Sequence, residues 1–257
     1  MIVYADSFVI PIVVCHGKPT SIHYPSTRPG GQSFVASWVS VRFAGAYEPS
    51  NTEGSGDGEG ALIAPNWVLT AAHVGTEIKK GHTVTVGSDS AVVDSVLLHF
   101  DWEDGGPHDL ALLRLTKRIR NVPAVRLYRG SGEVDREVIL VGYGDYGTGL
   151  TGPKGNDRRV RGATNRIDEA TEYWLKFRFD APDDPRTTEL EGVSGPGDSG
   201  GPAFFGEGDS ARLAGVSSGQ SSRATGGKPG RYGVVEYYVR VSRYINWIES
   251  ITGPLPQ

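Results

Sequence analysis

Short apolar runs recur along the chain from residue 34 onward, and turn-forming residues separate them. The runs are rich in valine and aromatic residues and occupy residues 34–43, 61–72, 83–87, 91–100, 110–115, 137–144, 173–179, 212–218 and 232–241. Apolar runs of this length and spacing predict many short strands. The 36 glycines and 16 prolines of the chain agree with frequent turns. We therefore expect an all-β fold.

One segment near the C-terminus has the periodicity of an amphipathic helix. Its apolar positions follow at i, i+3, i+4 and i+7, and are Tyr244, Trp247, Ile248 and Ile251. Ser242 stands where an N-cap is expected, and Gly253 stands where the helix would stop. We expect a helix over 242–252 that packs its apolar face onto the β structure.

Polar segments separate the strand-like runs and precede them. Segments dense in glycine and polar residues predict exposed loops at 51–60, 145–159 and 220–230. Residues 1–33 are interpreted as a leader or propeptide-like segment. Their apolar start matches a secretory signal poorly, because Asp6 lies in it and no Lys or Arg precedes it.

Composition narrows the class of protein further. A chain of 257 residues with 38% hydrophobic residues is long enough to bury one large or two small β cores. The formal net charge of −4 gives no basic footprint for nucleic acid or an anionic membrane. No apolar run reaches the length of a membrane-spanning helix. Cys15 is the single cysteine, so no intrachain disulfide forms.

The segment Gly195-Pro-Gly-Asp-Ser-Gly-Gly-Pro202 carries the strongest chemical signal. Four glycines in eight residues suit a strained turn, because glycine tolerates positive φ and lets other groups approach the backbone. Such a turn can aim the N–H groups of Gly197 and Ser199 at one point, as an oxyanion hole requires. The alternative interpretation is a plain glycine-rich surface turn.

A serine nucleophile needs a base and an acid that orients the base. His73 ends the apolar run Trp67-Val-Leu-Thr-Ala-Ala-His73, and its imidazole suits a general base. Asp109 precedes the apolar run 110–115, where a partly buried carboxylate needs a partner. The alternatives are a packed or exposed histidine and a strand-capping aspartate.

The three segments together resemble the trypsin/chymotrypsin superfamily of serine peptidases, in a style similar to its bacterial secreted members. They occur in that family's order, His73, Asp109 and Ser199, 36 and 90 residues apart. The resemblance covers roughly residues 34 to 252. It implies two packed six-stranded antiparallel Greek-key barrels with a C-terminal helix. The first barrel would span about 34–125, the second about 126–241, and the helix 242–252.

The resemblance also implies roles for further residues. Gly142-Tyr-Gly144 resembles the family's Gly-Trp-Gly turn, and Asp198 resembles the acid that pairs with the freed N-terminus. Ser217 resembles the serine that hydrogen-bonds the triad aspartate. Ser217, Ser218 and Gly219 would form the strand that pairs with substrate.

Several positions depart from the family pattern. Gly58 and Val74 stand where a disulfide usually flanks the histidine, and Ser218 replaces a tryptophan. No Arg-Ile-Val-Gly-Gly activation sequence is present, and Val14-Cys-His-Gly17 is the candidate for a new terminus.

The residues expected to line the substrate pocket also differ from those of trypsin. Val193 stands where trypsin has an aspartate. We hypothesise that Glu236 projects into the primary pocket and attracts Arg or Lys side chains. The alternative for Glu236 is that it faces solvent or pairs with a loop arginine.

The expected function is that of a serine endopeptidase acting through an acyl-enzyme, without cofactor or metal. The alternatives are a non-catalytic or zymogen-locked relative that binds protein, and an esterase. The expected partners are protein or peptide substrates and proteinaceous inhibitors, with no nucleic acid and no membrane. We expect a monomer at a secreted, periplasmic or extracellular location.

Two acidic clusters are expected to be polar loops rather than metal sites. The first contains His99, Asp101, Glu103, Asp104 and His108 and includes Gly-Gly-Pro. The second is the acidic stretch 53–59, which we interpret as a solvated loop in preference to a weak calcium site.

Overall fold

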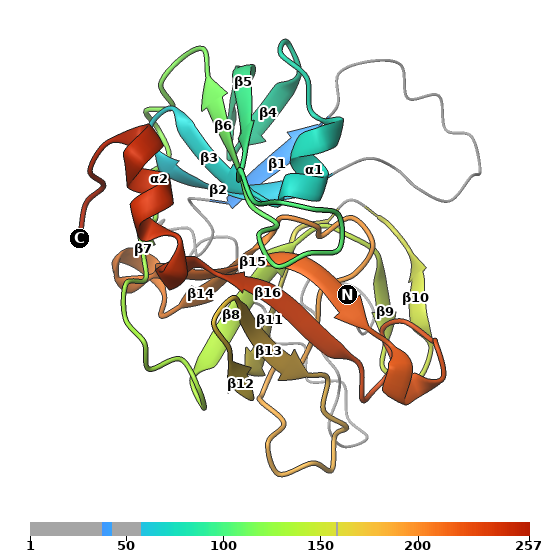
Figure 1. The fold of residues 1–257 in the computed structure, drawn as a ribbon. Coiled ribbons are helices and arrows are strands. Elements are labelled where there is room, and N and C mark those ends of the chain that lie inside the picture. The colour runs from blue at the N-terminus through green and yellow to red at the C-terminus, as the bar shows by residue number, and fades with distance from the viewer. Residues whose placement is uncertain (1–37, 43–57, 158) are drawn as a thin grey trace.

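The computed structural model describes residues 38–42, 58–157 and 159–257 of the chain (Figure 1). The expected leader at 1–33, Cys15 and the candidate terminus at 14–17 therefore lie outside the described residues. The two halves of the chain form two β structures stacked on one another, with a short helix at the C-terminal end.

Within the described residues, six antiparallel strands close into the first barrel. The strands are β1 (Trp38–Arg42), β2 (Gly58–Ala64), β3 (Trp67–Thr70), β4 (Thr83–Val86), β5 (Asp89–Leu98) and β6 (Ala111–Leu115). They pair in the order β1-β2-β3-β6-β5-β4. The valines of β4, Val84 and Val86, alternate with half-buried threonines, as expected of a strand with one face in the core.

The apolar run at 61–72 contains a turn. Pro65 and Asn66 separate β2 from β3, and Ala64 pairs directly with Trp67. Proline lacks the N–H group that a central strand needs, so the run folds back as a hairpin. The helix α1 (Ala72–Glu77) follows β3 at once and carries His73 in its first turn.

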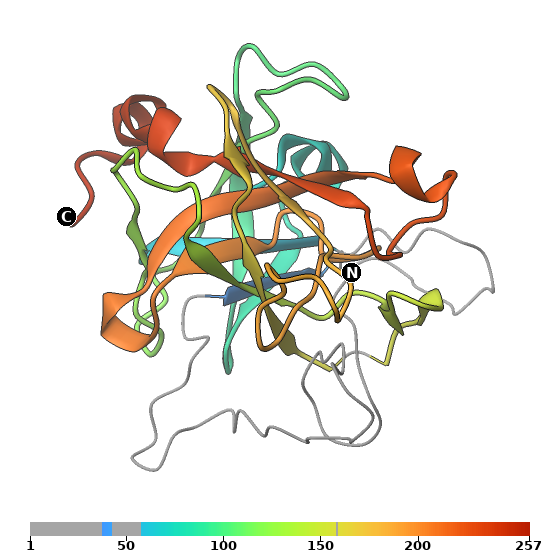
Figure 2. The ribbon, with the colours of Figure 1, turned by 90° about the horizontal axis from the view of Figure 1, so that it is seen from below.

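The second half of the chain forms one curled sheet (Figure 2). Its longer strands are β8 (Glu137–Gly142), β11 (Arg161–Arg166), β13 (Trp174–Arg178), β14 (Pro202–Phe205), β15 (Arg212–Ser221) and β16 (Val235–Arg240). The two-residue strands β7 (Arg126–Leu127) and β12 (Glu169–Ala170) join them. The two-barrel, all-β fold class is thus confirmed, although the second sheet as described has eight strands where six were expected.

The segments expected to be exposed loops contain more structure than predicted. Within 145–159, β9 (Tyr146–Thr148) and β10 (Gly152–Gly155) form a small hairpin. Within 220–230, a 3-10 turn spans Arg223–Thr225. The end of 51–60 belongs to β2, where Glu59 is completely buried. The prediction of a solvated loop was therefore wrong for Glu59.

The C-terminal helix α2 spans Ile245–Thr252 and begins three residues later than predicted. Ser242 lies in a preceding 3-10 turn, where its hydroxyl donates a 3.0 Å hydrogen bond to Glu133 and caps no helix. The predicted stop is confirmed, because Gly253 has φ +79°. The apolar face packs on the first barrel through Tyr244 and Ile248 (Figure 1). No helix in the described part of the chain is long and apolar enough to cross a membrane.

Candidate active site

His73 in α1 and Asp109, two residues before β6, contact each other. Nδ1 of His73 lies 2.7 Å from Oδ2 of Asp109, and the backbone N–H of His73 donates to Oδ1 at 2.8 Å. Asp109 is buried, whereas the His73 side chain is 33% exposed. Both oxygens of the carboxylate thus hold the histidine, one through its ring and one through its backbone. The sequence prediction that this aspartate needs a partner is met in the structure.

Burial and hydrogen bonding act in opposite directions on Asp109. Burial raises the pKa of its carboxyl group, but the hydrogen bonds and charge of His73 and the hydroxyl of Ser218 lower it more. The net effect is a pKa below the ordinary value, so the carboxylate stays ionised at neutral pH. An ionised acceptor at Nδ1 favours the tautomer whose Nε2 carries a lone pair.

The hydroxyl that supports Asp109 comes from Ser218, one residue after the position predicted. Ser218 Oγ donates to Asp109 Oδ2 at 2.6 Å. Ser217 is buried and its hydroxyl donates to Ser194 Oγ at 3.2 Å. The strand pairing explains the change, because the register of β15 against β16 shifts between Ser217 and Gly219. Ser218 lies in this irregularity, so its side chain has an orientation that simple alternation does not predict.

Ser199 lies in a turn that is anchored to both barrels. Its carbonyl accepts the N–H of Glu59 in β2 at 2.8 Å, and the next residue, Gly200, donates to the carbonyl of Ser217 at 2.9 Å. Gly200 has φ +79°, and a Cβ there would lie 3.1 Å from the backbone nitrogen of Ala71. The turn therefore presses against the segment just before His73. This close approach explains one of the glycines on which the sequence prediction rested.

Two backbone N–H groups of this turn have no acceptor among the residues that the structure describes. Gly197 has φ +97°, a left-handed conformation that favours glycine. Within the described residues, the N–H groups of Gly197 and Ser199 donate no hydrogen bond to the protein. Unpaired donors next to a partly exposed serine are what an oxyanion site needs.

Asp198 fixes the same turn from the inside. Its carboxylate is buried, and accepts the N–H of Gly144 at 2.6 Å and that of Gly195 at 2.9 Å. A Cβ on Gly142 would lie 2.8 Å from Cγ of Asp198, and one on Gly144 would lie 2.6 Å from the same atom. The glycines of the predicted Gly-Tyr-Gly turn are therefore required because Asp198 lies against their backbone.

Glu59 is a functional candidate that the sequence analysis missed. Its Oε1 accepts the N–H of Tyr143 at 2.6 Å, next to the bond between Gly144 and Asp198. The side chains of Glu59 and Asp198 are hydrogen-bonded to each other. Burial raises the pKa of Asp198 to about 6, although the Gly144 and Glu59 hydrogen bonds act to lower it. Glutamate among glycines and acidic residues at 53–59 gave no sign of this burial.

The missing disulfide beside the histidine is replaced by packing. A Cβ on Gly58 would lie 3.0 Å from Cγ2 of Val74 and closer still to Cγ1. Val74 is buried in the core of the first barrel. The valine side chain thus occupies the space next to α1, and glycine leaves the room that it needs.

Two predicted substrate-binding residues, Val193 and Glu236, are completely buried in the second half of the chain. Val193 is buried in a small cluster with Phe179 and Val234. Glu236 is completely buried, accepts a hydrogen bond from the hydroxyl of Ser194, and accepts one from Nε2 of Gln220 at 2.5 Å. The alternative that Glu236 faces solvent is therefore wrong, and the partners that the structure gives it are neutral.

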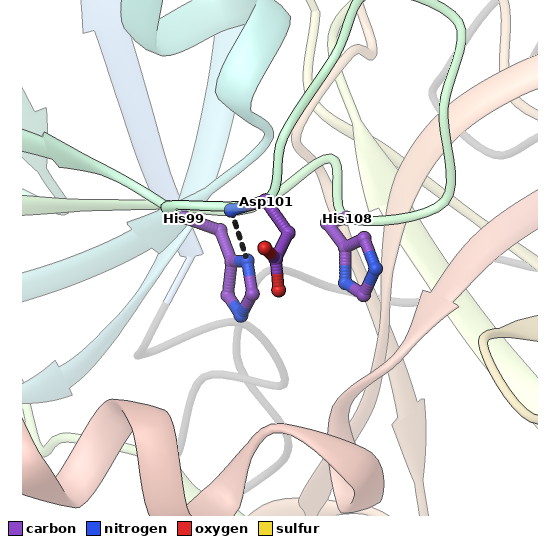
Figure 3. Close-up of side chains that lie close together, drawn as sticks. All are labelled: His99, Asp101 and His108. Carbon is purple, nitrogen blue, oxygen red and sulfur yellow. Dashed lines mark hydrogen bonds between the residues drawn. The ribbon is translucent and has the colours of Figure 1, made fainter.

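The histidine cluster before Asp109 differs from the predicted polar loop. Figure 3 shows His99, Asp101 and His108 extending from the loop between β5 and β6 toward α2, and their ligand atoms lie within 4.8 Å of one another. Asp101 is exposed, but His99 is only 7% exposed. The His99 ring also contacts Tyr244 and Trp247. This histidine is thus part of a buried aromatic cluster.

The ring geometry decides how well these histidines suit a metal. The imidazoles of His99 and His108 are stacked, with centroids 4.9 Å apart and planes inclined by 8°. Imidazole lone pairs lie in the ring plane, so two stacked parallel rings do not direct them at one ion about 2 Å from each nitrogen. Burial and the adjacent His108 also lower the pKa of His99, which favours a neutral packed ring. The arrangement fits an aromatic stack better than a metal centre.

A comparison with protein families agrees with this geometry. Residues 48–248 match the family model described as Trypsin. The match spans most of the chain and includes His73, Asp109 and Ser199. It confirms the resemblance that the three motifs indicated, and the chain belongs to the trypsin family of serine peptidases.

Proposed function

We propose that this protein is a serine endopeptidase that cleaves peptide bonds through an acyl-enzyme intermediate. Ser199 Oγ attacks the carbonyl carbon of the scissile bond, and Nε2 of His73 takes the hydroxyl proton and passes it to the leaving amine. Asp109 orients the imidazole and stabilises the imidazolium. The N–H groups of Gly197 and Ser199 bind the developing oxyanion.

The observation that carries this proposal is the pairing of His73 with Asp109. A buried carboxylate that accepts hydrogen bonds from both the ring and the backbone of one histidine has a clear use in general-base catalysis. A module that only binds protein has no physical need for this arrangement, nor for the two backbone N–H groups of Gly197 and Ser199 that lack a protein acceptor among the described residues. The proposal therefore favours an active peptidase over a non-catalytic relative.

The direct test is hydrolysis of a casein or peptide-library substrate by the wild type and by Ser199→Ala. We expect cleavage by the wild type and loss of nearly all of it in the variant, since only binding and oxyanion terms remain without the nucleophile. Ser250→Ala is the matched control, because Ser250 is an exposed serine of α2, remote from His73 in sequence and on another element. Equal cleavage by wild type and Ser199→Ala would show a contaminating activity and overturn the proposal.

For substrates, trypsin-family proteins act on proteins or peptides, and we propose a preference of this chain for Arg or Lys at P1. Support comes from Glu236, a buried acid that accepts a hydrogen bond from Ser194, the residue that follows Val193. A buried carboxylate attracts a cationic side chain strongly, because little solvent screens it.

Glu236→Gln tests this preference. The amide keeps the size of the side chain but removes its charge, so we expect kcat/KM for Arg and Lys substrates to fall about 10-fold or more relative to Leu and Phe substrates. The comparison uses a peptide library with P1 varied. An unchanged ranking of P1 residues would contradict the role of Glu236 and leave the peptidase assignment intact.

We also propose that residues 34–252 form the peptidase domain and that residues 1–33 precede it as a leader or propeptide-like segment. A secreted, periplasmic or extracellular site of action and a monomeric state follow as expectations for this family. N-terminal sequencing of the recovered protein tests whether residues 1–33 are removed, and cell fractionation tests the site of action.

A further inference from the structure

Glu59 contacts the candidate oxyanion turn at several points although it belongs to the first barrel. It is the second residue of β2, and its backbone N–H holds the carbonyl of Ser199 at 2.8 Å. Its carboxyl group accepts the N–H of Tyr143 at 2.6 Å. Its side chain is also hydrogen-bonded to Asp198. One residue thus joins the nucleophile's own backbone, the 142–144 turn and the buried aspartate.

The two carboxyl groups share one small space. A Cβ on Gly142 would meet both of them, with Oε1 of Glu59 at 2.9 Å and Cγ of Asp198 at 2.8 Å. A Cβ on Gly201 would lie 2.7 Å from Oε2 of Glu59. Glycines on both sides therefore leave room for this acid pair, and Glu59 is 0% exposed and Asp198 2% exposed.

Two carboxylates this close and this deeply buried cannot both be ionised cheaply, because desolvation and mutual repulsion each oppose the second charge. A single proton between them removes the repulsion and forms a short, charge-assisted hydrogen bond. Asp198 already accepts two backbone N–H groups, from Gly144 and Gly195, which favour its charged form and leave Glu59 as the donor. The pair then holds the proton on Glu59 and the charge on Asp198.

Other ionisable groups near the pair influence this proton. Burial is the main reason that the pKa of Asp198 is raised, and the charge of Glu236 raises it further. The guanidinium of Arg161 interacts with Asp198, but it also forms an ion pair with Asp157. Tyr238 is buried, and its hydroxyl remains neutral beside Glu236 and Asp198. Glu59 is the group that is hydrogen-bonded directly to Asp198 through a side chain.

We propose that Glu59 is a positioning residue, which shares a proton with Asp198 and thereby keeps the turn at 195–201 in the shape that directs the N–H groups of Gly197 and Ser199 at the oxyanion. This inference rests on the proposed peptidase function. It predicts that loss of the shared proton as pH rises places two charges in the pocket and distorts the turn. We then expect kcat to fall while KM changes little, because substrate contacts away from the turn persist.

The experiment measures kcat and KM from pH 5 to 10 for the wild type, Glu59→Gln and Glu59→Ala with one peptide substrate. Glutamine donates permanently from its amide and cannot ionise, so we expect kcat within about 3-fold of the wild type near pH 6 and no fall on the alkaline side where the wild type declines. Glu59→Ala removes the donor, and we expect kcat to fall about 100-fold with KM changed by less than 3-fold.

Glu133→Gln serves as the matched control, since Glu133 is another buried carboxyl group but pairs with Arg240 in the second half. It should lower stability without changing the alkaline limb of kcat. Should Glu59→Gln retain the wild-type alkaline limb, the shared proton is refuted, while the activity of the wild type still supports the peptidase. Inactivity of the wild type at every pH would count against the peptidase function itself. If Glu59→Ala does not fold, the comparison of wild type with Glu59→Gln decides alone.

Discussion

Two buried aspartates flank the candidate nucleophile, and their surroundings shift the pKa of their carboxyl groups in opposite directions. Asp109 lies in the first barrel and receives hydrogen bonds from His73 and Ser218, which lower the pKa of its carboxyl group despite burial. Asp198 lies under the turn of Ser199, and burial raises the pKa of its carboxyl group to about 6. The two aspartates thus differ in their neighbours. Asp109 has the donors His73 and Ser218, whereas Asp198 lies next to another acid, Glu59.

We propose that the difference corresponds to two separate tasks. An aspartate that orients a general base must stay charged when the imidazolium forms, so it needs donors that favour the ionised state. An aspartate that holds a backbone turn needs mainly fixed geometry, and a proton shared with a second carboxyl group supplies it. Substitutions at the two acids and at their partners can break or sharpen this comparison.

The largest effect is expected for Asp109→Asn. Asparagine keeps the shape of the side chain, but its amide favours the wrong tautomer of His73. We expect kcat to fall about 10⁴-fold, the size seen for the equivalent change in the best-studied triad of this family. Steady-state kinetics measure the fall. A loss below 10-fold would show that the pairing of His73 with Asp109 does not serve catalysis.

A large effect is also expected for Gly142→Ala, which tests the other aspartate. The added methyl group would lie 2.8 Å from Cγ of Asp198 and 2.9 Å from Oε1 of Glu59, too close for either group to stay in place. We expect kcat to fall about 10²- to 10³-fold, as for a lost oxyanion donor. Gly162→Ala on the paired strand is the control, because its nearest neighbour, the carbonyl of Leu140, would lie 3.5 Å away. Equal kcat values for the two variants would contradict the steric role of Asp198.

The two acids also predict opposite dependence of stability on pH. The lowered pKa of Asp109 adds stability above its ordinary value of 3.8, and this contribution is lost as pH falls. The pKa of Asp198 is raised from 3.8 to about 6, so the native state binds the extra proton and its advantage is lost as pH rises through that range.

Urea unfolding at several pH values measures this contrast. Between pH 4 and 6 we expect the stability of the wild type to fall relative to that of Asp198→Asn, by on the order of 1–2 kcal/mol for the acid pair as a whole. Below pH 4 the wild type should lose stability faster than Asp109→Asn. Parallel curves of unfolding free energy against pH for all three proteins would contradict the proposed difference in pKa between the two aspartates.

The smallest effect is expected for the hydroxyl that supports Asp109. Ser218→Ala removes one donor to a charged acceptor, which corresponds to about 1–2 kcal/mol and to a fall in kcat of about 10-fold. Ser217→Ala is the matched comparison, because that hydroxyl bonds Ser194 and not Asp109. A larger loss of kcat for Ser217→Ala than for Ser218→Ala would restore the role that the sequence predicted.

Sequence patterns predicted the parts of the molecule that depend on local residue types. Short apolar runs rich in valine and aromatic residues, separated by turn residues, predicted the strands, and the glycine-rich segment 195–202 predicted a strained turn. The role of Ser218 was missed because the prediction for Ser217 was carried over from the family resemblance, and the register shift in β15 cannot be seen in the sequence. The start of α2 was missed because Ser242 bonds Glu133 from a distant segment, which no local pattern reveals.

The burial of Glu59 was also beyond the reach of local patterns. Its neighbours in sequence are glycines and acids, which ordinarily form a solvated loop. Its burial depends on backbone donors at Tyr143 and on Asp198, which lie more than 80 residues away in the chain. Such pairings become visible only when the two barrels are assembled.

The most direct test of the central claim is covalent labelling with a fluorophosphonate probe, followed by peptide mapping. The serine oxygen displaces fluoride from phosphorus, so an activated Ser199 gains a stable phosphonyl group. We predict one adduct per molecule, located on Ser199 and absent from Ser199→Ala. Labelling should be slowed strongly by Asp109→Asn. A folded wild-type protein that gains no adduct, or gains it on another residue, would contradict the claim that His73, Asp109 and Ser199 form a working triad.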